Sequence, residues 1–485
     1  MIEVPVDYQL KYEELFINYQ KVLHELDQLK RLVFGPRHER FVPATPQEQL
    51  ALALGTQPQP PTDAAAVERI EYTRNKKETT QKIHTGRMKL PADLPREQVV
   101  IEPKEDVSGL KKIGEEITEE LERIPGKLFV RQYVRPKYAK ANGEGVLIGE
   151  LPDRPIAKGM AGPGLLAQIV IDKYTDHLPV YRQVQRLERE GIKLPLSTLT
   201  DWISGTCALL EPLYGALKKK VLSAHYLQAD ETPIKVLDKE KKHTTHRGYH
   251  WVYHAPVERL VLFDYREGRG REGPQEILKG FKGHLQTDGY AVYEDFDKKP
   301  SVTLLHCWAH ARRKFDEAMD NDLVRASYAL TEIQKLYALE RHIKADGLSC
   351  QQAHGLRQQK AVPVLDELKN WMLENYKSVL PKSVIGQALH YSLERFDKLV
   401  LYTTDGNLHI DNNLVENAIR PVAVGRKNYL FAGSHKGARR AAMLYSFLGT
   451  CKINEVNPFE WLKTTLEKIP AHPVNKIEEL LPRKV

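Results

Sequence analysis

The first apolar pattern in the chain is a seven-residue repeat close to its N-terminus. Two interleaved sets of apolar positions form this stripe. The first set is Tyr12, Tyr19, Leu26 and Val33, and the second set is Tyr8, Leu15, Val22 and Leu29. An a/d stripe is typical of a short coiled coil, and hence of self-association, although a helix packed on its own protein gives the same stripe over so few heptads. We therefore expect a leucine-zipper-like helix over residues 1–42.

The pattern changes over the next hundred residues. Residues 43–84 are rich in Pro, Gln and Ala at first, and a run of Lys and Arg begins at Arg74. Such a run can neutralise phosphates, and a solvated linker has the same composition, so we expect a linker that is basic at its end. Residues 85–150 alternate short apolar runs with Gly/Pro turns, which predicts a small β-rich module.

Residues 151–220 follow a helical pattern. The segments LLAQIVIDKY and VYRQVQRLERE each predict a helix, Gly191 ends the second, and Ser197 is expected to cap a third, STLTDWISGTCALL. The order of helix, glycine turn and capped helix matches a helix-turn-helix outline, but any corner between two helices has that outline. A DNA-reading role and a purely structural corner are both open at this point.

Residues 221–316 predict a mixed α/β sheet. Three strand-like runs come first, HYLQADETPIKVL, GYHWVYHAP and RLVLFDYREGR, and the second and third are expected to form a meander. Helices and strands then alternate, in the order GPQEILKGF, GHLQTDGY, SVTLLHCW and AHARRKFDEAM. Residues 317–404 are almost purely helical. Residues 405–450 begin with a further helix that carries Glu416, and residues 451–485 form a tail.

Composition narrows the class of protein. A chain of 485 residues with 41% apolar and 28% charged residues is expected to form two to four soluble globular domains. It contains neither a long apolar run nor a signal peptide, so we expect a cytoplasmic protein without a membrane partner. The four scattered cysteines predict neither a disulfide framework nor a structural zinc site. The formal net charge of +8 weakly favours a polyanionic partner such as DNA.

Three carboxylates far apart in the sequence share a type of placement. Asp230 in QADETP and Asp288 in QTDGY each fall where an apolar strand is expected to meet a turn, and Glu416 falls at the start of a helix. Carboxylates at strand ends of an α/β sheet lie at its reactive edge, and three of them suit two-metal phosphoryl transfer with magnesium. The alternative is that the aspartates are turn residues and the glutamate only favours the helix dipole.

Four blocks of the sequence resemble a known protein family, and this signal is more specific than the placement of the three carboxylates. HYLQADETPIKVL, HLQTDGY, LLHCWAHARRKF and DNNLVENAIRPVAVGRKNYLFAGS resemble successive blocks of insertion sequence 66 family transposases, and the N-terminal and C-terminal segments also resemble that family. The resemblance implies an α/β catalytic core with a ribonuclease H-like mixed sheet and an all-α insertion. Helical and β-rich N-terminal modules would serve DNA binding and oligomerisation. The Asp-Asp-Glu triad of the family falls on Asp230, Asp288 and Glu416.

The resemblance also implies cofactors and partners. We expect two Mg²⁺ ions, which Mn²⁺ can replace, and a bacterial cytoplasmic enzyme that acts on nucleoid DNA. It would cut insertion-element ends and join 3′-hydroxyl ends to target DNA as a homo-oligomer, with accessory proteins of the same element. Two other functions stay open: a catalytically silent DNA-binding regulator, and a metal-dependent nuclease without strand transfer. Assaying joined products separately from nicked products divides the three.

We also expect roles in phosphate contact, orientation and helix capping for several residues near the triad. Phosphate contacts are expected from Arg312, Arg313, Arg420, Arg426 and Lys427. Cys307 and His310 are expected either to orient the site or the DNA, or to be a buried structural pair. Asn412 and Asn413 are expected to cap the helix that carries Glu416.

The module at residues 85–150 departs from the family. Family members usually place cysteine pairs in this region, but no cysteine precedes Cys207 in this chain. Because structural zinc prefers thiolate ligands, we predict that the module binds no zinc. Contact with DNA through Arg131, Arg135 and Lys137 does not depend on the metal.

Overall fold

The computed structural model describes residues 153–156, 159–238 and 244–483, together with Gly126, Leu128 and two short strands. The chain divides into two compact units, Met1–Gly149 and Glu150–Val485. In the first unit, β1 (Lys137–Ala139) pairs antiparallel with β2 (Val146–Ile148), and both lie in the predicted β-rich module. The predicted leucine-zipper-like helix over 1–42, the linker over 43–84 and the rest of the module over 85–150 lie outside the described residues.

The second unit begins with three helices at the positions that the pattern predicts. They are α3 (Pro163–Tyr174), α4 (Val180–Arg189) and α5 (Leu196–Leu222). Gly191 follows α4 with a φ of +85°, a conformation that glycine adopts at little cost. The predicted cap is wrong. Ser197 is the second residue of α5, because the helix already begins at Leu196 after the extended N-cap Pro195, which has no side-chain cap.

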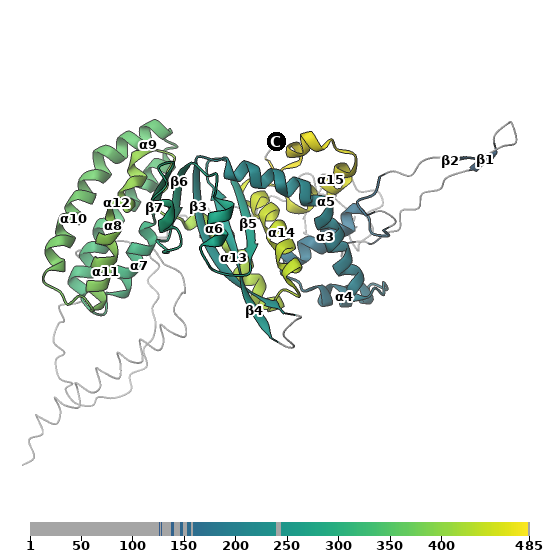
Figure 1. The fold of residues 1–485 in the computed structure, drawn as a ribbon, viewed down its shortest axis with the longest axis horizontal. Coiled ribbons are helices and arrows are strands. Elements are labelled where there is room, and N and C mark those ends of the chain that lie inside the picture. Colours follow the sequence, from purple (N-terminus) through teal and green to yellow (C-terminus); the bar gives the residue numbers. More distant parts are fainter. Residues whose placement is uncertain are drawn as a thin grey trace, which may run out of the picture. The chain divides into compact units, whose positions relative to one another are not determined.

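A five-stranded mixed sheet forms the centre of the second unit (Figure 1). Its strand order is β5-β4-β3-β6-β7. The strands are β3 (Tyr226–Leu237), β4 (Thr245–Ala255), β5 (Leu260–Arg266), β6 (Gly283–Thr287) and β7 (Val302–His306). The first three form an antiparallel meander, and β6 and β7 join β3 in parallel. The predicted mixed α/β sheet is therefore confirmed.

Successive side chains along a strand point to opposite faces of the sheet, and helical elements lie against both faces. On β4, His250 lies against Tyr445 of α14 (His435–Ile453), whereas its neighbour Trp251 lies against Tyr293 on the opposite face. The face of His250 also receives α13 (Asn413–Tyr429), which packs on β3 and β4. The opposite face lies near α6 (Glu272–Ile277) and η1 (Glu294–Phe296).

The segment between β7 and α13 is helical, as predicted, and has a core of its own. Its elements are α7 (Trp308–Glu317), α8 (Leu323–Ala345), α9 (Cys350–Leu356), η2 (Arg357–Ala361), α10 (Val362–Tyr376), α11 (Val384–Glu394), α12 (Phe396–Leu399) and η3 (Val400–Thr404). We call this segment the insertion. Its core includes Leu305 and Trp308, so the end of β7 joins it to the sheet.

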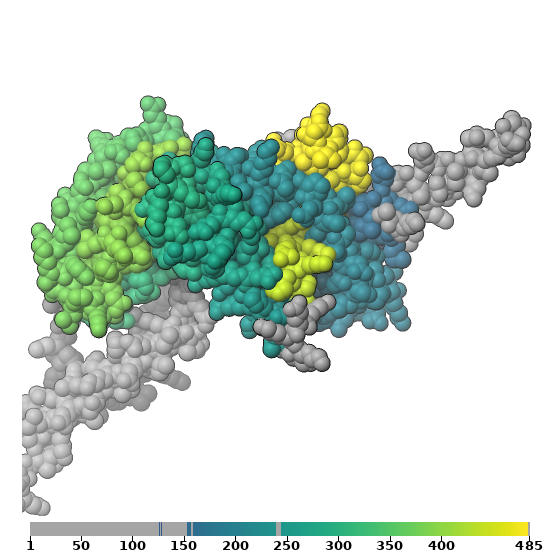
Figure 2. Space-filling model, in the orientation of Figure 1, coloured from purple at the N-terminus to yellow at the C-terminus, as the bar shows by residue number. Residues whose placement is uncertain are grey.

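The C-terminal segment returns to the first helices of the unit. α15 (Pro458–Lys468) packs on α3, and η5 (Val474–Leu480) packs on α5, with η4 (Ile469–Ala471) between them. The space-filling view shows this yellow segment beside the blue-teal helices (Figure 2). Within the described part of the chain, no helix is both long and apolar enough to cross a bilayer. All four cysteines are free thiols.

Candidate active site

Asp230 does not end its strand, and the prediction that it does is wrong. It lies near the middle of β3 and pairs with Val252 of β4. The strand continues through Thr232 and Pro233 because β4 pairs with it along its whole length to Leu237. β6 pairs with β3 only from Tyr226 to Gln228, so Pro233 lies where β3 has an open edge, and the missing N–H costs no hydrogen bond to β6. Asp230 therefore lies just beyond the end of the parallel ladder.

Asp288 comes directly after the last residue of β6, as predicted. Its Oδ1 accepts a hydrogen bond from the backbone N–H of Tyr290 at 2.9 Å, which forms a turn onto the carboxylate. Gly289 makes this turn with a φ of +86°, and a side chain there would also collide with Arg395. From the insertion, the hydroxyl of Tyr391 donates to the backbone carbonyl of Asp288 at 2.8 Å. The second aspartate is thus held from both sides.

Glu416 lies in the first turn of α13. The predicted caps are wrong: neither Asn412 nor Asn413 caps this helix through its side chain, and the carboxylate of Asp411 instead accepts from the backbone N–H of Asn413 at 3.1 Å. Asn412 occupies the N-cap position, but its side chain is fully buried and its Oδ1 and Nδ2 atoms make no hydrogen bond to the helix. The Nε2 atom of His310 lies 3.7 Å from a carboxylate oxygen of Glu416.

The alternation along β3 turns Asp230 toward the helix that carries Glu416. Residues 228, 230 and 232 share one face of the strand. Gln228 accepts from the backbone N–H of Val415 at 3.3 Å, and the hydroxyl of Thr232 accepts from Arg426 at 2.9 Å. Because both neighbours of Asp230 on this face contact α13, Asp230 faces the same helix. The structure therefore brings the first and third predicted carboxylates to one face of the sheet.

Electrostatics link all three carboxylates. The pKa of Asp230 is raised well above its ordinary value, first by burial and then by the negative charges of Glu231, Asp288 and Glu416, while a hydrogen bond from the backbone of Glu231 opposes the shift. A bound cation would relieve the repulsion that these negative charges exert on the buried Asp230 carboxylate. Neighbouring Glu231 points to the opposite face and binds Arg269, with Nε 2.8 Å from its Oε1.

Oxygen ligands of this kind fit a divalent cation. Magnesium is usually bound through one or two carboxylates, with waters and substrate phosphates completing the octahedron. Within residues 153–238 and 244–483, no three His, Cys, Asp or Glu side chains are close enough to enclose an ion by themselves. A site that shares its ligands with a DNA phosphate does not need such an enclosure, so the donor set suits magnesium or manganese rather than zinc.

The predicted phosphate-binding residues divide into two groups. Arg420 and Lys427 are exposed, and they lie about one and three helical turns after Glu416 on the same face of α13. Arg426 faces the other way, and its guanidinium donates to Thr232 and to the carbonyl of Pro233 at 2.5 Å. On α7, Arg313 is exposed and Arg312 is half-buried. Arg426 thus holds α13 on β3, while Arg420 and Lys427 lie exposed on the face of α13 that carries Glu416.

Cys307 and His310 both lie beside the helix start. The buried thiol of Cys307 accepts from the backbone N–H of Asn412 at 3.4 Å. Burial raises the pKa of this thiol, so it stays protonated, which does not favour metal ligation by its sulfur. His310 is partly exposed beside Glu416. Both residues therefore contact the segment that carries the third carboxylate.

Sequence reasoning missed four residues that hold the site: Gln228, Gln286, Tyr391 and Arg269. The two glutamines had a visible signal, because LQAD at 227–230 and LQTD at 285–288 repeat the same spacing before an aspartate. Tyr391 and Arg269 stand in no such pattern.

Family models match most of the chain. The model described as "Transposase IS66 family" matches residues 158–440, and the "IS66 C-terminal element" matches 446–482. Residues 22–99 match "Transposase C of IS166 homeodomain", and 106–139 match "zinc-finger binding domain of transposase IS66". The last segment contains neither Cys nor His, and the absence of zinc stays a prediction.

Three relatives show the extent of the similarity. Uncharacterized protein y4hP of Sinorhizobium fredii is 33% identical over 487 residues, covering 94% of this chain and 87% of that protein. Uncharacterized protein y4jD of the same organism is 31% identical over 480 residues, covering 94% of this chain and 93% of that protein. Uncharacterized protein YuaK of Escherichia coli is 41% identical over 49 residues, covering 10% of this chain and 52% of that protein.

Proposed function

The chain belongs to the IS66 transposase family, and from this premise we propose that it cuts the ends of its insertion element and joins the 3′-hydroxyl ends to target DNA. The proposal assigns Asp230, Asp288 and Glu416 as the catalytic carboxylates. The observation that carries it is the position of Asp230, which faces α13 and whose pKa is raised first by burial and then by negative charges that include those of Asp288 and Glu416.

We propose further that the core is ribonuclease H-like. An antiparallel meander followed by two parallel strands supports this assignment, as does the placement of carboxylates on the central strand β3 and directly after its parallel neighbour β6. The helical insertion before the glutamate also fits the proposal, because it separates β7 from α13 in sequence while leaving α13 packed on β3.

In the proposed mechanism the three carboxylates hold two Mg²⁺ ions, which Mn²⁺ can replace. Bound divalent cations would activate the attacking oxygen and stabilise the leaving oxygen. The protein itself supplies positioning. Arg420 and Lys427 lie on the Glu416 face of α13 and would hold DNA phosphates. His310 would keep the Glu416 carboxylate turned toward the site.

Partners follow from the same proposal. DNA is the substrate, and self-association and accessory proteins of the element complete the reaction. A nuclease without strand transfer is the competing function, because it would use the same carboxylates. Joined products distinguish the two, since a nuclease yields nicked products alone.

The test uses a donor plasmid that carries the gene with its flanking DNA, together with Asp230→Asn, Asp288→Asn and Glu416→Gln. Each variant is expected to lose cleavage by at least about 10²-fold while retaining DNA binding in a mobility-shift assay, because metal ligands act on the chemistry and cations on affinity. Glu460→Gln is the matched control, since Glu460 also lies in the first turn of a helix but far from the site in sequence. Mg²⁺-dependent cleavage at the wild-type rate would remove the altered residue from the triad.

A further inference from the structure

Two buried glutamines stand in register on adjacent strands. Gln228 of β3 pairs with Gln286 of β6, and each precedes a proposed catalytic aspartate by two residues. Both side chains are 0% exposed. Burying an amide is unfavourable unless its donors and acceptors are satisfied, so the partners of these glutamines indicate what they do.

Their partners belong to the segment that leads into α13. The Nε2 of Gln228 lies 2.9 Å from the carbonyl oxygen of Asp411, and its Oε1 accepts from the backbone N–H of Val415. The Nε2 of Gln286 donates to the carbonyl of His409 at 2.8 Å. The two glutamines therefore bind both ends of a short segment, residues 409–415, that immediately precedes Glu416.

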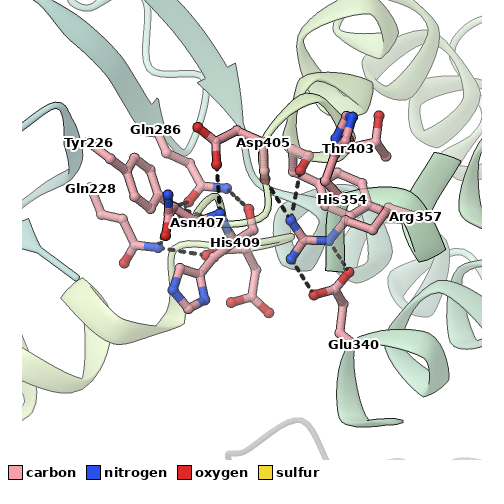
Figure 3. Close-up of polar contacts among 12 residues, drawn as sticks. Tyr226, Gln228, Gln286, Glu340, His354, Arg357, Thr403, Asp405, Asn407 and His409 are labelled. Carbon is pink, nitrogen blue, oxygen red and sulfur yellow. Dashed lines mark hydrogen bonds and ion pairs between the residues drawn. The ribbon is translucent and has the colours of Figure 1, made fainter. Parts of the chain in front are cut away.

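The glutamines are also bound to each other. The Nε2 of Gln228 lies 2.9 Å from the Oε1 of Gln286, which also accepts from the hydroxyl of Tyr226 at 2.5 Å. The same hydroxyl accepts from the backbone N–H of His409 at 3.2 Å. Figure 3 shows Tyr226, Gln228 and Gln286 beside the chain at His409. The network links the strand of one aspartate, the strand of the other, and the segment before the glutamate.

We propose that Gln228 and Gln286 are positioning residues that set the place of Glu416 relative to Asp230 and Asp288. The inference rests on the proposed function of the three carboxylates. Each glutamine lies on the strand that carries or leads to an aspartate, so a shift of either strand is transmitted directly to the helix of the glutamate. Hydrogen bonds to the backbone of residues 409–415 fix the first turn of α13 without contact with the reacting atoms.

The cost of losing such positioning can be bounded. Residues that orient metal ligands typically change metal affinity about 10- to 100-fold when they are replaced. Methionine has nearly the shape of glutamine without its hydrogen-bonding groups, so Gln228→Met and Gln286→Met remove the bonds and keep the packing. Gln183→Met is the matched control, because Gln183 is equally buried on α4 and donates to the carbonyls of Ile169 and Leu178.

The experiment measures Mn²⁺ binding to the full-length protein by electron paramagnetic resonance in the presence of duplex DNA from the element end, because the site is expected to share its ligands with a DNA phosphate, and the signal change from DNA alone is subtracted. Glu416→Gln is expected to weaken binding, both glutamine-to-methionine variants are expected to weaken it about 10-fold or more, and Gln183→Met is expected to leave it unchanged. Adding Gln228→Met to Glu416→Gln is expected to cause little further loss, because no carboxylate is left to position. A general structural effect would instead weaken binding equally in both backgrounds.

The outcomes separate this inference from the proposed function. Wild-type affinity in Glu416→Gln would show that Glu416 is not a ligand and would overturn both. Weak binding in Glu416→Gln combined with wild-type affinity in both glutamine variants would overturn the positioning role alone. Should Gln228→Met not fold, Tyr226→Phe decides the matter, since it removes only the hydroxyl that holds His409 and Gln286. Wild-type affinity in that variant would refute the inference.

Discussion

Replacing Arg357 by Met is expected to destabilise the insertion by about 3–5 kcal/mol, the usual cost of removing one partner from a buried ion pair. Arg357 lies in η2 with 3% of its surface exposed. Its guanidinium binds both carboxylate oxygens of Glu340 in α8, at 2.8 and 2.7 Å. Two further hydrogen bonds reach the carbonyls of Tyr402 and Asp405, at 3.0 and 2.8 Å. Figure 3 shows this guanidinium between Glu340 and the chain near Asp405.

The magnitude follows from what the substitution leaves behind. Glu340 has 16% of its side chain exposed, so its carboxylate would lose both charged hydrogen bonds with little water to replace them. A second change, Glu340→Leu, removes the unpaired carboxylate and is expected to recover about half of the loss or more. The carbonyls of Tyr402 and Asp405 remain without their donor in either case, so recovery is expected to be incomplete.

Urea unfolding monitored by circular dichroism and tryptophan fluorescence measures both variants. Lys335→Met is the matched control: Lys335 also binds a glutamate on α8, Glu332, but its side chain is 54% exposed, and its loss is expected to cost less than about 1 kcal/mol. A loss below about 1 kcal/mol in Arg357→Met, or no recovery in the double variant, would refute the reasoning. Unchanged m-values would confirm that only stability differs.

Three further predictions concern the sheet and α13. Arg269→Gln leaves the carboxylate of Glu231, whose side chain is 4% exposed, without its ion pair, so the melting temperature is expected to fall. Adding Glu231→Gln is expected to restore the melting temperature, and a double variant that shows no restoration would contradict the pairing. Burial, followed by the charge of Arg426, lowers the pKa of His250 to about 3, so the folded ring stays neutral while the unfolded chain binds a proton below about pH 6.5. Stability is therefore lost as the pH falls from about 6.5 toward 3, by up to about 1.4 kcal/mol per pH unit, and His250→Leu is expected to reduce that slope in urea unfolding; an unchanged slope would count against it. Lys427→Ala is expected to weaken DNA binding and to reduce its salt dependence by about one ion, whereas Arg426→Ala is expected mainly to lower the melting temperature; the reverse result would exchange their roles.

The elements of the second unit could be predicted because their signals are local. The runs that gave β4 and β5 are short, rich in aliphatic and aromatic residues and bounded by polar turns, and the helices of the insertion repeat apolar positions on a helical period. The position of Asp230 inside β3, rather than at its end, could not be found in this way. Thr232 and Pro233 resemble a turn in the sequence, yet the strand continues because β4 pairs with it, and that partner begins after a loop.

The surroundings of the three proposed carboxylates depend on distant contacts rather than on the local sequence. Asn412 stands where a capping residue is expected, but the fold buries it and leaves the capping contact to Asp411. Arg426 and Lys427 are adjacent and equally basic, and only the packing of α13 on β3 turns one inward and leaves the other exposed. The bond between Gln228 and Val415 joins residues whose proximity no local pattern encodes.

The insertion contacts the backbone on both sides of the proposed site, although it lies outside the sheet. Tyr391 of α11 donates to the carbonyl of Asp288, and Arg357 of η2 binds the carbonyl of Asp405, a few residues before the segment that the glutamines hold. The Nε1 of Trp308 on α7 donates to the carbonyl of Leu399 at 2.9 Å and closes the insertion at its base. An appendage joined only at its ends would make no contact with the aspartate turn. Removing the insertion would therefore release the second aspartate and the segment before the glutamate together, so we do not expect the sheet with α13 alone to form a working site.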